Sequence, residues 1–104
     1  MGRKKHLEQL KEFKLALAKE VPIDKMILFG SRAKGKSHRW SDFDVLVISK
    51  WFENKKFRYR GIGFRKLWQL DYPVDFLCYT PKEFHKLKKE PSLVSQAVRE
   101  GITI

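Results

Sequence analysis

Two short apolar runs decide the fold: Met26–Phe29, which reads MILF, and Asp42–Ser49, which reads DFDVLVIS. Both have the length and the β-branched or aromatic content of strands. A parallel crossover needs a dozen or more residues, usually including a helix. Only the ten residues 32–41 separate Ser31 from Asp42, so we expect the two strands to be antiparallel. That arrangement brings Ser31 beside Asp42 and Asp44.

Further elements extend the pattern in both directions. Apolar residues at helical spacing predict a helix over residues 5–20, and Pro22 ends it. The basic and aromatic stretch 52–70 is expected to contain a helix that Gly61 and Gly63 interrupt. The other expected elements are a strand at Val74–Tyr79, a helix starting at Pro81 with Thr80 and Glu83 as a capping box, a helix at Ser92–Arg99 and a last strand at 102–104. This order predicts an α/β (α+β) fold in which helices flank a small mixed sheet of three to four strands. We expect residues 1–104 to form a single domain.

The sequence Asp42-Phe43-Asp44 places two carboxylates on one face of a strand, roughly 7 Å apart at the Cα atoms. Phe43, Val45 and Val47 would face the other side. Two like charges at the head of an apolar strand are costly unless a cation binds between them. Mg²⁺ is such a cation, because it takes carboxylate oxygens and completes its shell with substrate phosphates. The alternative is an acidic strand start that faces solvent.

Three further residues are candidates for the same site as these two acids: Gly30, Ser31 and Asp75. A glycine at a strand-to-helix turn lets backbone approach a ligand, and the N–H groups of the helix that follows can receive an anion. Ser31 is expected to cap that helix, and an ordinary capped loop is the alternative. Asp75 is the lone acid in the apolar run 73–77 and is a candidate third ligand or base. Asp71, its competitor, precedes Pro73 in an expected exposed turn.

These residues carry a specific resemblance. The chain resembles the DNA polymerase beta nucleotidyltransferase superfamily in its Gly-Ser, x10, Asp-x-Asp signature. In this sequence the signature consists of Gly30-Ser31, ten residues and Asp42-Phe43-Asp44. Asp75 matches that superfamily's third carboxylate, and the wording Gly-Ser-Arg-Ala-Lys-Gly from position 30 resembles the minimal nucleotidyltransferases of bacteria and archaea.

The resemblance implies nucleotidyl transfer assisted by two Mg²⁺ ions about 3.5–4 Å apart, with Asp42, Asp44 and Asp75 as metal ligands and catalytic residues. Gly30 and Ser31 would hold the β- and γ-phosphates of ATP or another NTP. Arg32 and Lys34 would neutralise the triphosphate, unless they are solvated residues of a short helix. His38 is expected to be a loop residue.

The resemblance also implies that a partner or a second copy of the chain completes the site. Minimal members are often paired with a HEPN-type toxin, and some transfer AMP to its tyrosine, which makes the enzyme an antitoxin. Two alternatives stay open. One is a non-catalytic binding module, and the other is a nucleotidyltransferase that acts on nucleic acid through the basic and aromatic residues 55–66.

Composition narrows the classes of partner. A formal net charge of +11 over 104 residues implies an anionic partner larger than one nucleotide. No apolar run approaches the roughly 20 residues of a membrane span, and a cytoplasmic location is expected. Cys78 is the only cysteine, which excludes an intramolecular disulfide framework, and we expect it to be a buried hydrophobe. Trp40, Trp51 and Trp68 are expected to be core or interface anchors.

Overall fold

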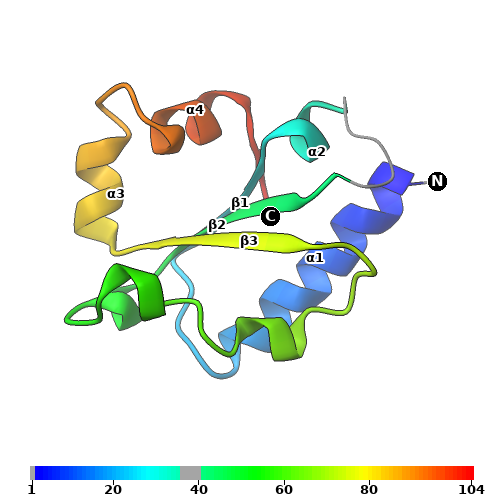
Figure 1. Ribbon diagram of the computed structural model, residues 1–104, viewed down its shortest axis with the longest axis horizontal. Coiled ribbons are helices and arrows are strands. Elements are labelled where there is room, and N and C mark those ends of the chain that lie inside the picture. Colours follow the sequence, from blue (N-terminus) through cyan, green and yellow to red (C-terminus); the bar gives the residue numbers. More distant parts are fainter. Residues whose placement is uncertain (1, 36–40) are drawn as a thin grey trace.

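The fold is a four-stranded sheet with helices on both sides, and the computed structural model describes residues 2–35 and 41–104 of it (Figure 1). His38 and Trp40 lie outside the described residues. The helices are α1 (Gly2–Ala18), α2 (Ser31–Lys34), α3 (Pro81–Leu87) and α4 (Leu93–Glu100). The strands are β1 (Lys25–Phe29), β2 (Phe43–Ile48), β3 (Val74–Tyr79) and β4 (Ile102–Thr103).

The sheet has the order β3-β2-β1-β4. β1 pairs with β2 in the antiparallel sense, as the short connection predicts, and β4 is antiparallel to β1. β3 is parallel to β2, so the sheet is mixed. The predicted fold class is confirmed.

The alternation of side chains along β2 divides the core into two layers. Phe43, Val45 and Val47 pack with Leu10, Phe13 and Leu17 of α1. Leu46 and Ile48 face the other way and pack with Phe84 of α3 and with Val94 and Ala97 of α4. Figure 1 shows α1 on one side of the sheet and α3 and α4 on the other. Because β2 is covered on both faces, charged side chains are tolerated only at its ends.

Two local expectations are wrong. The segment between β2 and β3 contains no α-helix in the described residues; it forms three single 3₁₀ turns, η1 (Lys50–Phe52), η2 (Phe57–Tyr59) and η3 (Phe64–Leu67). Gly63 has φ 93°, a left-handed value that a continuing helix cannot accommodate. Gly30, rather than Ser31, is the N-cap of α2, and Ser31 is its first residue.

Other expectations are confirmed. Thr80 and Glu83 form the predicted capping box of α3. Cys78 is buried, and burial raises the pKa of its thiol to about 12. Trp68 packs edge-on against Phe13 and Phe43 in the core. None of the helices in the described ranges combines the length and the apolar character needed to cross a bilayer.

Candidate active site

The candidate site lies at the end of the sheet where β2 begins. In the register of the strands, Asp44 stands opposite Phe29 of β1 on one side and opposite Asp75 of β3 on the other. Partners across a ladder share a face of the sheet, at a strand spacing of about 4.8 Å. Two of the three predicted acids are therefore nearest neighbours on one face, although 30 residues lie between them in the sequence.

Gly30 brings the turn after β1 against the carboxylate of Asp44. Its backbone has φ 78° and ψ −159°, a conformation that is essentially restricted to glycine. A β-carbon added at Gly30 would stand 2.5 Å from Oδ2 of Asp44. The glycine therefore allows both the turn and the close approach of the acid to it.

The three acids repel one another. The pKa of Asp44 is raised, first because burial disfavours its charged form and then because of the negative charges of Asp75 and Asp42. The two ion pairs found among the described residues, Lys34–Glu100 and Arg60–Glu83, include none of these acids.

Uncompensated carboxylates of this kind are hard oxygen donors, and they suit Mg²⁺ chemically. Within residues 2–35 and 41–104, however, no three His, Cys, Asp or Glu side chains are already gathered into a metal-binding group. The fit to a cation thus rests on the donor chemistry and on the raised pKa of Asp44.

Arg32 is held by the protein. It is 9% exposed, and its guanidinium lies 4.5 Å from the ring centre of Phe43 and 4.4 Å from that of Tyr72. Its Nη2 and Nε donate hydrogen bonds to the carbonyl of Ser41, at 2.7 and 3.1 Å. Because Ser41 directly precedes Asp42, Arg32 fixes the backbone from which the first acid projects.

Lys34 and Ser31 differ in how far they are engaged. Nζ of Lys34 forms an ion pair with Glu100 of α4 at 2.7 Å, and this pair ties α2 to α4. Ser31 is half-buried, and its hydroxyl makes no hydrogen bond within the described part of the chain. The serine is free to bind a ligand, while Lys34 would first have to leave its carboxylate.

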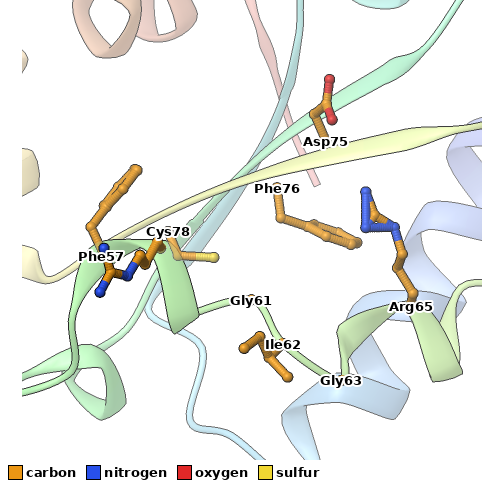
Figure 2. Close-up of a pocket in the computed structure, with 9 residues that line it drawn as sticks. Phe57, Gly61, Ile62, Gly63, Arg65, Asp75, Phe76 and Cys78 are labelled. Carbon is orange, nitrogen blue, oxygen red and sulfur yellow. The ribbon is translucent and has the colours of Figure 1, made fainter.

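A hollow of about 460 Å³ lies between β3 and the segment that precedes it (Figure 2). Asp75, Phe76 and Cys78 of β3 line it, and so do Arg58 and Ile62 of the preceding segment. Figure 2 shows the carboxylate of Asp75 on the opposite side of β3 from Phe76, as alternation along a strand requires.

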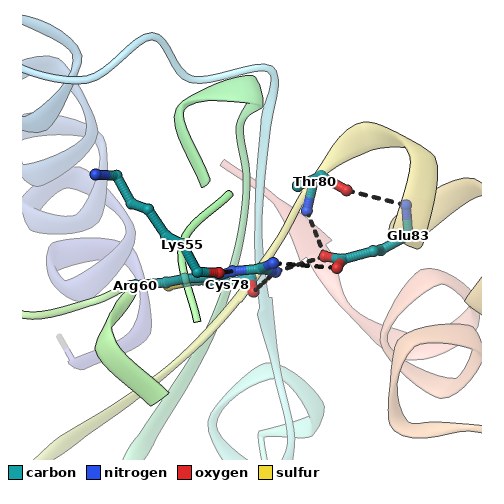
Figure 3. A network of polar contacts seen from close by, with 5 residues as sticks. All are labelled: Lys55, Arg60, Cys78, Thr80 and Glu83. Carbon is teal, nitrogen blue, oxygen red and sulfur yellow. Dashed lines mark hydrogen bonds and ion pairs between the residues drawn. The ribbon is translucent and has the colours of Figure 1, made fainter. Parts of the chain in front are cut away.

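Sequence reasoning missed the residue that holds this segment in place, Arg60. Its guanidinium donates to both carboxylate oxygens of Glu83, at 2.5 and 3.1 Å, and to the carbonyls of Lys55 and Cys78 (Figure 3). The hydrogen bond from Arg60 is the main reason that the pKa of Glu83 is lowered. The arginine lies in a run of basic residues, and nothing in that run marks it as the buried one.

Comparisons with known proteins give a family match and a likeness of fold. The family described as "Nucleotidyltransferase domain" matches residues 10–104. A crystal structure from Sulfolobus solfataricus, of a protein provisionally named a nucleotidyltransferase, superposes with a TM-score of 0.69 at 20% identity. The match covers 97% of this chain and 80% of that one, and at this identity it bears on the fold alone. No curated protein matches the chain significantly.

Proposed function

The chain belongs to the nucleotidyltransferase domain family, and from this premise we propose that Asp42, Asp44 and Asp75 carry out transfer of a nucleoside monophosphate from an NTP to a hydroxyl group. ATP is the proposed donor, with AMP as the group transferred. The domain is proposed to span the whole of residues 1–104.

One observation carries this assignment: Asp44 stands in register with Asp75 and in contact range of Gly30. The contact supports a donor site in which the turn at Gly30 and the hydroxyl of Ser31 receive the terminal phosphates of the NTP. The α-phosphate would then lie toward the carboxylates. Arg32 acts as a positioning residue, because it holds the backbone before Asp42.

The proposed reaction is an in-line displacement. The acceptor hydroxyl oxygen forms a bond to the α-phosphorus, the bond from that phosphorus to the oxygen that bridges to the β-phosphate breaks, and pyrophosphate leaves. Asp75 holds the acceptor hydroxyl, whose proton passes to its carboxylate or to water. Asp42 and Asp44, with Asp75, would hold Mg²⁺, which when bound neutralises charge on the phosphates.

For the biological role we propose that the acceptor is a tyrosine of a HEPN-type toxin, whose modification makes this protein an antitoxin. The support is the resemblance of the Gly-Ser to Asp-x-Asp segment to minimal nucleotidyltransferases. The charge of +11 supports a partner that is larger than a nucleotide and anionic.

The test uses labelled ATP, Mg²⁺ and the purified chain with a co-expressed partner. We expect Asp44→Asn and Asp75→Asn to reduce label transfer by about a hundredfold or more, since each removes a charged ligand. Asp71→Asn is the matched control, because Asp71 is an exposed acid four residues before Asp75. Circular dichroism of each variant checks the fold.

Two results would refute the proposal. Equal labelling in wild type and Asp44→Asn would remove the carboxylates from the reaction. Neutralisation of the partner by a fully inactive Asp44→Asn variant would favour a binding module that acts by occlusion.

A further inference from the structure

Residues 50–66, which we term the basic-aromatic loop, expose an unusual amount of apolar surface. Seven large hydrophobic side chains are exposed in the described part of the chain, and four belong to this loop. They are Trp51, Phe57, Tyr59 and Ile62, exposed by 41%, 48%, 51% and 69%. Contiguous exposed apolar side chains with a polar rim are typical of a binding surface.

The same loop carries much of the positive charge of the protein. It contains seven Lys or Arg residues and one acid, Glu53. All of these basic residues except Arg60 are exposed. Nζ of Lys55 lies over the ring of Trp51 at 4.2 Å, and the guanidinium of Arg58 lies over that of Tyr59 at 4.9 Å. Two exposed cations of the loop thus lie over exposed aromatic rings.

The loop is preorganised by the strand it covers. The guanidinium of Arg60 joins it to Glu83 and to the carbonyl of Cys78. Nη2 of Arg65 donates to the carbonyl of Val74 at 2.5 Å. The ring of Phe57 packs 5.2 Å from that of Tyr79, centre to centre. Because these contacts hold the loop at both ends of β3, it loses less conformational entropy when a partner binds than a free loop would.

The hollow in this surface borders β3, the strand that carries Asp75. Arg58 and Ile62 of the loop line it, and so does Asp75, whose carboxylate points to the other face of β3 (Figure 2). Asp75 is in turn in register with Asp44. A segment seated on the loop and continuing around the open edge of β3 would therefore reach the carboxylate that is assigned to the acceptor hydroxyl.

We propose that the basic-aromatic loop is the docking surface for the acceptor, an acidic polypeptide segment that presents a hydroxyl side chain at Asp75. This inference rests on the proposed function and specifies the acceptor of that reaction as an acidic polypeptide. Charge complementarity favours an anionic occupant.

The side chains themselves favour a polypeptide over a nucleic acid. Ile62, the most exposed of the four, has no ring on which a base can stack, and one face of Phe57 is already covered by Tyr79. Arg60 and Arg65 are engaged with β3, which leaves fewer guanidinium groups for phosphates.

The test measures binding and transfer separately, with a fluorescent random glutamate–tyrosine copolymer as the acceptor. The variant Lys56→Glu with Arg58→Glu reverses two exposed charges of the loop. The variant Lys11→Glu with Lys19→Glu makes the same change in net charge on exposed positions of α1 and its end. We expect the loop variant to bind the copolymer about tenfold more weakly, and the α1 variant to bind it nearly as wild type does. Ile62→Ser should also weaken binding, with no change in charge.

Asp44→Asn separates this inference from the proposed function, because it should bind the copolymer normally and transfer no label. If the wild-type protein binds the copolymer through the loop but transfers no label to it, the catalytic assignment alone is overturned. Equal loss of binding in the loop and α1 variants would overturn the docking surface, because it would show a response to net charge only. Tighter, loop-dependent binding of an oligothymidylate that also accepts label would overturn it in favour of a nucleic acid.

Discussion

Replacing Gly30 by alanine tests the turn on which the candidate site depends. The residue has φ 78° and ψ −159°, and an added β-carbon would stand 2.5 Å from Oδ2 of Asp44. Two penalties follow, one in the backbone and one in the contact with the carboxylate. They differ in size and in what they affect.

The backbone penalty governs stability. An L-residue in this region costs roughly 1–3 kcal/mol, which corresponds to a fall of about 4 °C or more in the melting temperature of a domain of this size. The contact with Asp44 is cheaper in energy, because the carboxylate ends a side chain that can rotate away. That rotation removes the acid from its place beside Gly30, so we expect the larger effect of the contact on nucleotidyl transfer.

Urea unfolding and label transfer distinguish these two effects. Gly30→Ala should lose stability and transfer together. In an Asp44→Ala background, Gly30→Ala should still cost roughly 1–3 kcal/mol, because the backbone strain persists without the carboxylate. Gly63→Ala is a comparator for stability, since its φ of 93° is also left-handed but its added β-carbon would meet only the Lys66 side chain, at 3.7 Å.

Two outcomes would refute this reasoning. If the cost of Gly30→Ala disappears in the Asp44→Ala background, the clash dominates and the backbone is not strained. If Gly30→Ala keeps both its stability and its transfer activity, the close approach of the turn to Asp44 has no functional role.

Three further predictions concern charge and burial. Because the folded-state pKa of Asp44 is raised, its ionisation opposes folding; Asp44→Asn should be more stable than wild type at pH 7, and melts at decreasing pH should show this advantage vanish below the ordinary value of 3.8. Arg60→Met should lower the free energy of unfolding, measured in urea, by roughly 2–3 kcal/mol, since it removes charged hydrogen bonds to Glu83 and leaves the Cys78 carbonyl without that donor. Glu83→Gln should cost less. Because the pKa of Glu83 is lowered in the folded state, wild type loses stability as pH falls below 4.5, and Glu83→Gln should lose less of it. Cys78 should not react with an aromatic disulfide reagent in the native protein at pH 8 and should react fully in urea; rapid native labelling would contradict its burial and its pKa of about 12.

The sheet could be predicted from the sequence because its signals are local. The apolar runs of β1, β2 and β3 have strand length, and the short connection between the first two excludes a parallel crossover. The capping box at Thr80 and Glu83 is likewise specified within four residues. The pairing of Asp44 with Asp75 follows once β3 is placed beside β2, which local pattern alone does not decide.

The segment between β2 and β3 could not be predicted in the same way. Its helical appearance came from composition, while its conformation is set by long-range bonds from Arg60 and Arg65 to β3. The same applies to Arg32, whose stacking on Phe43 and Tyr72 no local pattern indicates. Tertiary contacts decide which of the many arginines are buried or bonded to the protein, and the net charge does not show which ones they are.

The hydrogen bonds from these two arginines to β3 have a consequence for self-association. β3 is an edge strand, and an open strand edge invites pairing with another chain. Arg65 and Arg60 occupy the carbonyls of Val74 and Cys78, which point away from β2, so an incoming strand would have to displace a charged group at each end. The loop thereby protects the edge against intermolecular β-pairing, and loss of either arginine creates an aggregation risk in a protein that its charge otherwise keeps dispersed.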